Sequence, residues 1–428
     1  MDENRRKNKK KIICKFYLKK NPHFSFKKAG RVQEKNKILV AMSGGIDSSV
    51  AAALLKKAGF NVIGVFMKFW ADPQKNSLEG SNRCCSSEAE NRARKVAKIL
   101  KIPFYIFDFS QEFKKRIVDY FLKEHKIGNT PNPCVVCNNE IKFGLLLEKA
   151  LSLGADFVAT GHYARLRQSD SNLPMTSELS EYSEHSNVNL DHSDRILLRA
   201  KDKNKDQSYF LWMLKQGQLK KILFPIGDYT REEVERLARK FKLPVLEAKK
   251  SVEICFIEKT VNDFLRKYLK EKPGLIVEKI SKKGQKKHSN ILQSVRALDG
   301  YRILGKHKGL WFYTIGQRKG IGLSGGPFWV LEKDLKKNLL IVTRNEKDLL
   351  NKELFCKDVN WISGKEPKLP LKVKAKIRYR TDFAKATIYH FKNKIYRVIF
   401  EKPQRAITPG QSVVFYKGEE LLGGGIIC

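Results

Sequence analysis

Seven residues near the start of the chain, Ser43 to Ser49 (SGGIDSS), join a short apolar segment to an amphipathic one. Residues 37–42 before them are apolar and β-branched, which predicts a buried strand. Apolar side chains then recur every three or four residues from Val50 to Ala58, and Gly59 follows, which predicts a helix with a glycine stop. The loop glycines permit a tight turn, and a helix start directs unpaired N–H groups at one point. The sequence therefore predicts a cradle for a phosphate anion.

This loop differs from the better-known P-loop, which needs a lysine before its Ser or Thr to reach the β and γ phosphates. No lysine occurs within residues 43–49. The loop resembles instead the PP-loop of the pyrophosphatase-type ATPases, which split ATP between the α and β phosphates and leave AMP on an acceptor oxygen. A tight strand-to-helix turn without a ligand is the alternative.

Segments of strand and helix character alternate after the loop. We expect strands at 61–68, 103–109 and 156–160, and helices at 86–100, 113–125 and 141–153. Such alternation is typical of a doubly wound parallel sheet with helices on both faces. Ligands of such sheets bind beyond the carboxyl ends of the strands. The loop, the end of the second strand near Met67 and the Gly161-His162 pair should therefore line one crevice.

A chain of 428 residues is long enough for two or three domains. The expected parts are a basic N-terminal tail at 1–36, a catalytic α/β domain at 37–260, a small central domain at 261–330 and an antiparallel β-barrel at 331–428. Residues 168–194 contain no Lys or Arg and read as an exposed, mobile acidic insertion.

The last of these domains carries a regular pattern of charge. Apolar residues alternate with Lys or Arg from Leu371 to Arg380. A period of two predicts a strand with five apolar side chains inward and five cations outward. That basic face suits a phosphate backbone, although an ordinary solvated strand face is the alternative.

The whole chain is strongly basic. Lys and Arg total 85 against 45 Asp and Glu, a net charge of +40. A polyanion such as nucleic acid is the natural partner, and a generally lysine-rich composition is the alternative. No apolar run approaches 18 residues, so we expect no membrane span. The basic tail lacks the apolar core of a signal peptide.

Eight cysteines are scattered along the chain and form no disulfide framework, which fits a reducing cytoplasm. Cys134 and Cys137 lie in a segment punctuated by prolines that we expect to be a loop leading into a helix. A zinc site would need a second such pair, and the sequence has none. A redox pair remains possible, and a thiol at a helix start is inclined toward the nucleophilic thiolate. Cys255 lies among apolar residues, where an inert buried thiol is the alternative to a sulfur carrier.

These motifs together resemble the bacterial tRNA-specific 2-thiouridylases, the MnmA/TrmU family. The resemblance runs from about Lys37 to Cys428. It rests on AMSGGIDSSV, GVFMKFW, NPCVVCNNEIKFG, ATGHYAR, KDQSYFLW, EICFI, HKGLWFYTIGQRKG and QRAITPGQSVVFY, in this order.

The resemblance implies a function. Members of the family use ATP and Mg²⁺ to adenylate the C2 oxygen of the wobble uridine in the tRNAs for lysine, glutamate and glutamine, and then replace that oxygen with sulfur. The implied partners are the anticodon stem-loop and a persulfide donor or relay protein. We expect a cytoplasmic monomer with no metal fixed by protein ligands alone.

The resemblance also implies roles for single residues. Cys137 matches the nucleophile and Cys255 the persulfide carrier, and the two would form a transient disulfide. The positions that match ATP contacts are Ala41, Met42, Ser43, Gly44, Gly45, Ile46, Asp47, Ser48, Met67 and Gly161. Those that match contacts with the target base are Asn132, Pro133 and Cys134. Those that match tRNA contacts are His162, Lys205, Asp206, Gln207, Arg378, Tyr379 and Gln411.

One departure from the family concerns Cys134, because many members have there an Asp with an assigned acid/base role. A smaller departure is Val252, which replaces the more usual Gln. Two other functions remain as alternatives. Another PP-loop ligase would need no thiols at its site, and no glutaminase segment is visible. An RNA-binding protein that has lost catalysis would not need the loop and both cysteines intact.

Overall fold

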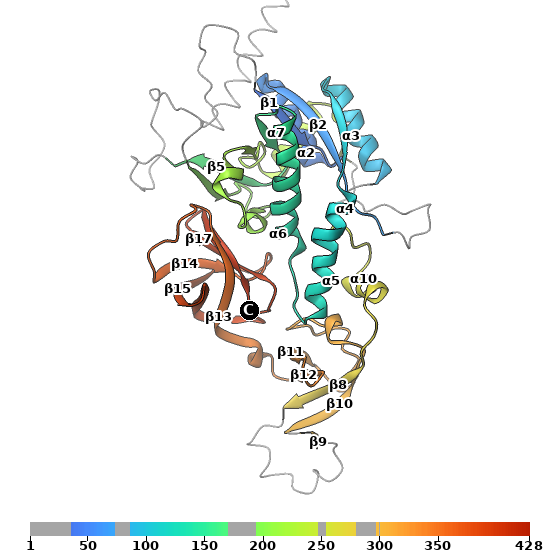
Figure 1. Ribbon diagram of the computed structural model, residues 1–428, viewed down its shortest axis with the longest axis vertical. Helices are drawn as coiled ribbons and strands as arrows, with labels where there is room; N and C mark the ends of the chain where they lie inside the picture. The colour runs from blue at the N-terminus through green and yellow to red at the C-terminus, as the bar shows by residue number, and fades with distance from the viewer. Residues whose placement is uncertain (1–35, 73–85, 170–193, 247–253, 280–296, 299) are drawn as a thin grey trace, which may run out of the picture.

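The computed structural model describes residues 36–72, 86–169, 194–246, 254–279, 297–298 and 300–428. The basic tail and nearly all of the acidic insertion fall outside these residues. A parallel-sheet domain forms one end of the molecule, a small central sheet forms the opposite end, and a β-barrel lies beside the long helices that connect them (Figure 1).

The N-terminal domain is built on a five-stranded parallel sheet with strand order β3-β2-β1-β4-β7. Its strands are β1 (Lys37–Ala41), β2 (Asn61–Lys68), β3 (Phe104–Asp108), β4 (Phe157–Ala159) and β7 (Ile222–Leu223). The sequence placed the first four of them to within two residues.

Both faces of this sheet are covered. Ile38 and Val40 of β1 pack into one apolar cluster, and Leu39 and Ala41 pack into another. The first cluster contains side chains of α2 (Ile46–Ala58), α3 (Ser87–Leu100) and α9 (Arg231–Lys240). The second contains side chains of the helices between residues 110 and 152. Because alternate residues of one strand enter both clusters, the expected doubly wound sheet is confirmed.

Two long helical runs lie side by side and extend from the parallel sheet toward the central sheet (Figure 1). One consists of α4 (Ser110–Phe113), the π-helix η2 (Lys114–Val118) and α5 (Asp119–Lys126). The other consists of α6 (Pro133–Cys137), the π-helix η3 (Asn138–Leu145) and α7 (Leu146–Ser152). The expectation that Cys134 and Cys137 occupy a loop is therefore wrong, since both lie on α6. Proline is well suited to the first turn of a helix, and Pro133 begins this one.

The central sheet has strand order β11-β12-β8-β10-β9 and is preceded by α10 (Val261–Tyr268). Its strands are β8 (Gly274–Lys279), β9 (Ala297–Leu298), β10 (Tyr301–His307), β11 (Trp329–Asp334) and β12 (Leu339–Thr343). The boundary expected at residue 331 falls inside β11. Since β12 pairs with β8 in parallel, this sheet extends to Thr343.

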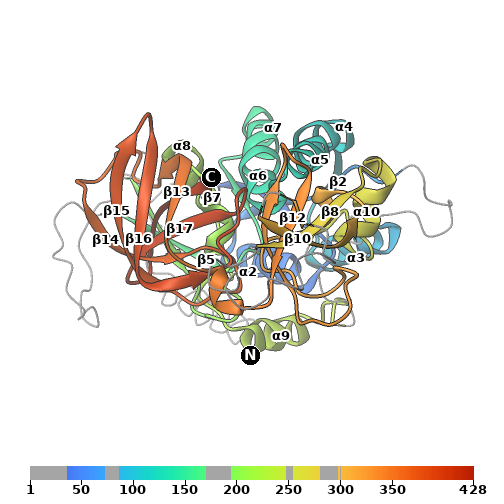
Figure 2. The same ribbon diagram turned by 90° about the horizontal axis from the view of Figure 1, so that it is seen from below.

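Six antiparallel strands form the C-terminal barrel, which closes through the pairing of β13 with β18 (Figure 2). They are β13 (Leu350–Trp361), β14 (Leu371–Lys376), β15 (Ala384–Lys392), β16 (Ile395–Arg405), β17 (Ser412–Lys417) and β18 (Glu420–Ile427). A hairpin of β5 (Ala164–Gln168) and β6 (Arg195–Arg199) extends the sheet at β18, so N-terminal residues join the barrel directly.

The alternating segment behaves as predicted over only part of its length. Val373 and Ala375 are buried and Lys372 and Lys374 are exposed. The strand ends at Lys376, however, and the outward orientation expected for Arg378 is wrong. Its guanidinium turns inward and donates to the carbonyls of Ile315 and Ala406 and to Thr408.

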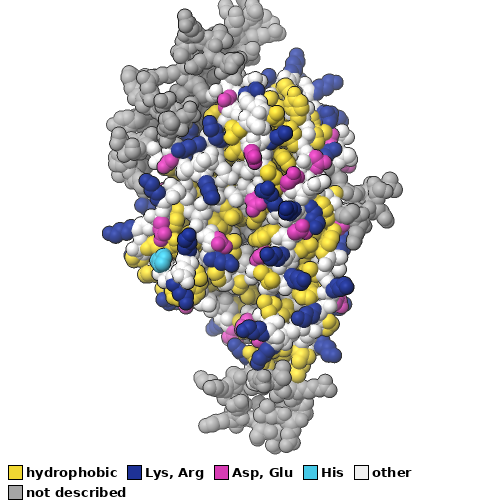
Figure 3. Space-filling view, viewed as in Figure 1, with side chains coloured by type: hydrophobic (Ala, Val, Ile, Leu, Met, Phe, Trp, Pro, Cys, Tyr) yellow, Lys and Arg dark blue, Asp and Glu magenta, His cyan; other side chains and the backbone are white. Residues whose placement is uncertain are grey.

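Lys and Arg side chains are spread over the whole face seen in Figure 3, from the parallel-sheet domain to the central sheet. Within the described ranges, no helix combines the length and the apolar character that crossing a bilayer requires.

Candidate functional site

The loop between β1 and α2 has the form of an anion cradle. Gly44 has a φ of 72°, and a Cβ there would lie 2.1 Å from the carbonyl oxygen of Ala89. Gly45 is the N-cap of α2 and offers no side chain to cap it. The Ser48 hydroxyl instead accepts from the Ser43 N–H at 3.1 Å and holds the loop closed. The glycines thus keep the start of α2 open to an anion.

Gly161 brings the end of β4 against this loop. A Cβ at Gly161 would lie 2.5 Å from the Ser48 nitrogen and 2.6 Å from the Asp47 carbonyl carbon. β4 and β2 both pair with β1, so Met67 near the end of β2 belongs to the same edge of the sheet. The structure therefore brings the three expected nucleotide-contacting segments to one place.

Asp47 of the loop is held by two side chains. The Tyr163 hydroxyl donates to its Oδ1 at 2.8 Å, and Arg231 donates to the same oxygen at 3.0 Å. Burial raises the pKa of Asp47 above its ordinary value, and Arg231 acts against this increase. Sequence reasoning missed both partners. Tyr163 directly follows Gly161-His162, but no local signal marks Arg231, which is 184 residues away from Asp47.

A short turn connects this loop to the thiol-bearing helix. The Gln207 side-chain oxygen accepts from the Tyr163 N–H at 2.9 Å. Three residues later, the Phe210 carbonyl accepts from the amide of Asn138, the neighbour of Cys137, at 3.1 Å. Residues 207–210 therefore link the Asp47 environment to the end of α6.

Cys137 is buried at 7% exposure, whereas Cys134 on the same helix is partly exposed. Cys137 and Cys255 belong to the same apolar cluster, Cys255 at its partly buried edge. The neighbouring Phe256 packs against Phe113 and Phe121, with ring centroids 5.8 and 5.4 Å apart. Since η2 also contacts α6, the segments that carry the two thiols pack against the same helical run.

The structure buries or engages most of the positions expected to contact tRNA. His162 is buried with Nδ1 at 2.8 Å from the Thr160 hydroxyl, and burial lowers its pKa well below the ordinary value. Asp206 is 8% exposed and accepts from Arg199 and two backbone N–H groups. Tyr379 packs on Phe210 with centroids 4.5 Å apart.

Gln411 donates to the Thr130 carbonyl at 2.7 Å and thereby fixes the segment that leads into Asn132, Pro133 and Cys134. Lys205 is exposed, and its charge opposes the increase that burial causes in the pKa of Asp47. Among the described residues, no group of three or more His, Cys, Asp or Glu side chains is arranged to hold a metal ion.

These features define a class. A doubly wound sheet with a glycine loop at a helix start, and without a P-loop lysine, is a PP-loop-type nucleotide-binding domain, here joined to a small sheet and a closed barrel.

Comparison with known proteins identifies the family. The family model described as the tRNA methyl transferase HUP domain matches residues 36–259, a tRNA methyl transferase PRC-barrel domain matches 262–344, and an aminomethyltransferase beta-barrel domain matches 351–427. The tRNA-specific 2-thiouridylase MnmA 1 of Caldanaerobacter subterraneus is 44% identical over 396 residues, which are 92% of this chain and 98% of that protein. MnmA 2 of Thermoanaerobacter sp. (strain X514) is 43% identical over the same shares.

The chain therefore belongs to the tRNA-specific 2-thiouridylase family. Among solved structures, an NH3-dependent NAD synthetase from Campylobacter jejuni aligns with 67% of this chain and 86% of that chain. At 16% identity and a TM-score of 0.29, the two structures are only distantly similar.

Proposed function

We propose that this chain is an ATP-dependent sulfurtransferase that converts the wobble uridine of the tRNAs for lysine, glutamate and glutamine to 2-thiouridine. The relatives that span nearly its whole length are named tRNA-specific 2-thiouridylases. The observation that carries the proposal is the segment 207–210, because it links the Asp47 loop to the helix that ends at Cys137.

In the first step the uridine C2 oxygen attacks the α phosphorus of ATP, and pyrophosphate leaves. The open N–H groups at the start of α2 would hold the departing phosphates, and Gly161 keeps the loop in place by close packing. Mg²⁺ would neutralise phosphate charge in this step. Asp47 is the only carboxylate within residues 43–49, so at this loop the phosphates would supply most of the ligands of the ion.

In the second step a persulfide on Cys255 attacks C2, and AMP leaves. The Cys137 thiolate then attacks the γ-sulfur of Cys255, which breaks the persulfide S–S bond and leaves the outer sulfur on the base. The product disulfide joins Cys137 and Cys255, and a dithiol reductant reopens it. The shared packing of both thiol segments against the run of residues 110–126 supports this pairing.

Asn132, Pro133 and Cys134 would meet the target base at the start of α6. Asn132 contacts the buried Tyr209 hydroxyl, and this contact fixes the approach to the helix. Lys205 and the exposed lysines of β14 are suited to tRNA phosphates. The target base would enter the site from the single-stranded anticodon loop, where unstacking a base costs little free energy. After each turnover a persulfide donor must restore the persulfide on Cys255.

The adenylation step can be tested without sulfur. ATP labelled at the α phosphate is incubated with the protein and unmodified tRNA, and AMP and its tRNA adduct are measured. We expect AMP or adduct to form only when tRNA is present, in the wild type and in Cys255→Ser alike. ATP consumption at the same rate with and without tRNA would contradict the proposed reaction.

A further inference from the structure

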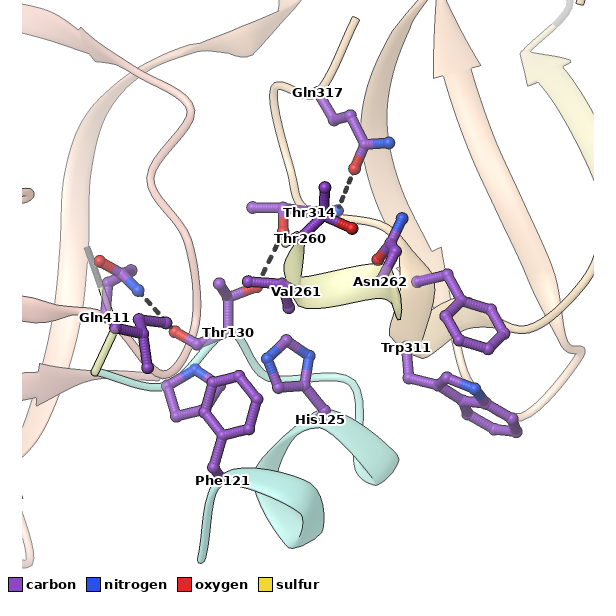
Figure 4. Close-up of a pocket in the computed structure, with 13 residues that line it drawn as sticks. Phe121, His125, Thr130, Thr260, Val261, Asn262, Trp311, Thr314, Gln317 and Gln411 are labelled. Atoms are coloured by element: carbon purple, nitrogen blue, oxygen red, sulfur yellow. Dashed lines mark hydrogen bonds between the residues drawn. The ribbon is translucent and has the colours of Figure 1, made fainter. Parts of the chain in front are cut away.

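A cavity of about 450 Å³ lies where the two long helical runs meet the central sheet and the barrel (Figure 4). Its walls come from the end of α5, the segment before α6, the start of α10 and the region of the 3₁₀-helix η5 (Leu310–Phe312). Gln411 adds a wall from the barrel domain. Its volume is within the range of small-ligand pockets.

The lining of this cavity combines aromatic rings with neutral polar groups. Phe121, His125, Trp311 and Phe312 supply rings, while threonine hydroxyls and three amide side chains supply donors and acceptors. Among the described residues, none of those that line the cavity carries a charged side chain. Burial, assisted by the Lys333 ammonium, lowers the pKa of His125 to about 4, so its ring is neutral at physiological pH.

Part of the hydrogen-bonding capacity of the lining is unused. His125 is 3% exposed, and its Nδ1 has no hydrogen-bond partner among the described residues. The indole nitrogen of Trp311 likewise has none in the described part of the chain. By contrast, Gln411 is committed to the Thr130 carbonyl and Gln317 to the Thr314 N–H, so these two amides hold the walls. Figure 4 shows His125 between Thr130 on one side and Asn262 and Trp311 on the other.

The position of the cavity relates it to the proposed site of reaction. Thr130 and Pro131 line it and lead directly into Asn132 and the start of α6. Ile254 lines it and directly precedes Cys255. Arg318 and Lys319, which follow Gln317, are exposed and available to a phosphate outside the cavity.

We propose that this cavity binds a nucleobase that neighbours the target uridine in the single-stranded loop of the RNA substrate. The inference rests on the proposed function, since it assigns a second subsite to the same RNA. A base is neutral and planar, stacks on aromatic rings and offers donors and acceptors at its edge, which is the combination that this lining complements. A phosphate or carboxylate would find no charged partner among the described residues of the lining.

The test compares RNA binding by Trp311→Leu and Asn262→Ala with wild type, using fluorescent anticodon stem-loops. One RNA is intact, and two carry an abasic nucleotide on the 5′ or 3′ side of the target. We expect one abasic RNA to bind wild type roughly 5- to 150-fold more weakly than the intact RNA. Trp311→Leu should lose a similar factor on the intact RNA and nothing further on that abasic RNA. Tyr389→Leu removes an exposed ring from β15 outside the cavity and should bind like wild type.

The proposal is overturned if both abasic RNAs bind wild type as tightly as the intact RNA, or if the abasic change weakens wild type and Trp311→Leu equally. It is also overturned if Trp311→Leu binds RNA normally but slows thiolation only when sulfur comes from a protein persulfide, because the cavity would then serve the donor. Asn262→Ala, at a partly exposed helix position, gives the same comparison if Trp311→Leu does not fold. These are binding measurements, so failure to form 2-thiouridine would count against the proposed function separately.

Discussion

Adding one methyl group at Gly161 should displace the nucleotide loop by crowding its backbone, while every side chain within residues 43–49 stays unchanged. In Gly161→Ala the new Cβ would lie 2.5 Å from the Ser48 nitrogen and 2.6 Å from the Asp47 carbonyl carbon. Both neighbours are backbone atoms and cannot rotate away. Ordinary contact begins at about 3.4 Å, so the start of α2 must move by about 0.9 Å.

Two effects of different size follow from this displacement. Overpacking of this kind costs about 1–3 kcal/mol of stability. A shift of about 1 Å in groups that position a reacting phosphate lowers the rate on the order of 100-fold. We therefore expect weak ATP binding and slow tRNA-dependent AMP formation, with only a moderate loss of stability.

Gly217→Ala is the matched control. Gly217 lies in the short helix α8 (Gln216–Leu219), and a Cβ there meets nothing within 4 Å. This substitution should leave ATP binding unchanged and stabilise the helix by up to about 1 kcal/mol. Calorimetric titration with ATP and thermal unfolding of both variants test the prediction. If Gly161→Ala binds ATP and unfolds as Gly217→Ala does, the packing of β4 against the loop does not position the nucleotide.

Three further substitutions test charges in the structure. Arg231→Leu should raise the pKa of Asp47 further, because burial already raises it and the opposing charge is lost. ATP affinity, measured as a function of pH, should then begin to fall at a higher pH than in wild type. An unchanged pH dependence would exclude a role for the Arg231 contact. The pKa of His125 is about 4 in the folded protein against an ordinary 6.5, so the unfolded chain takes up a proton first as pH falls. Wild type should therefore lose about 3 kcal/mol of stability between pH 6.5 and 4, and His125→Phe should not lose it. Chemical denaturation at each pH measures this difference. Burial alone would raise the pKa of Glu419, but the contacts with Lys203 and Arg165 lower it to about 2. Wild type should therefore be more stable than Glu419→Gln above pH 4.5, and this difference should fade as pH falls toward 2. A difference in melting temperature that does not change with pH would refute the prediction.

The elements around the loop were predictable because local pattern and burial agree there. β1, β2 and α2 with its Gly59 stop follow from apolar periodicity and a glycine that adopts a φ of 94°. The start of α6 was not predictable in this way. Prolines and asparagine before Cys134 read as a loop, whereas Pro133 fits a first helical turn and the buried Val135 and Cys137 draw that turn into the core.

Contacts between distant segments left no local signal. Arg378 belongs to an alternating pattern that predicts an outward cation, yet carbonyls from two other segments draw its guanidinium inward. The β5–β6 hairpin reads as part of the α/β domain, but its partner β18 is near the end of the chain. Nothing in the sequence near Asp47 indicates Arg231. Such contacts depend on how distant segments pack in three dimensions. The strand period of two residues and the helix period of 3.6 residues describe only local structure and do not predict them.

Mass spectrometry of nucleosides from unmodified tRNA, incubated with the protein, ATP, Mg²⁺, a persulfide donor and a dithiol reductant, tests the central claim most directly. We expect 2-thiouridine with wild type and with Cys428→Ser, whose thiol is exposed at the end of the barrel domain. We expect none with Cys137→Ser or Cys255→Ser. Absence of 2-thiouridine with wild type, or full activity of Cys255→Ser with the persulfide donor, would contradict the proposed reaction.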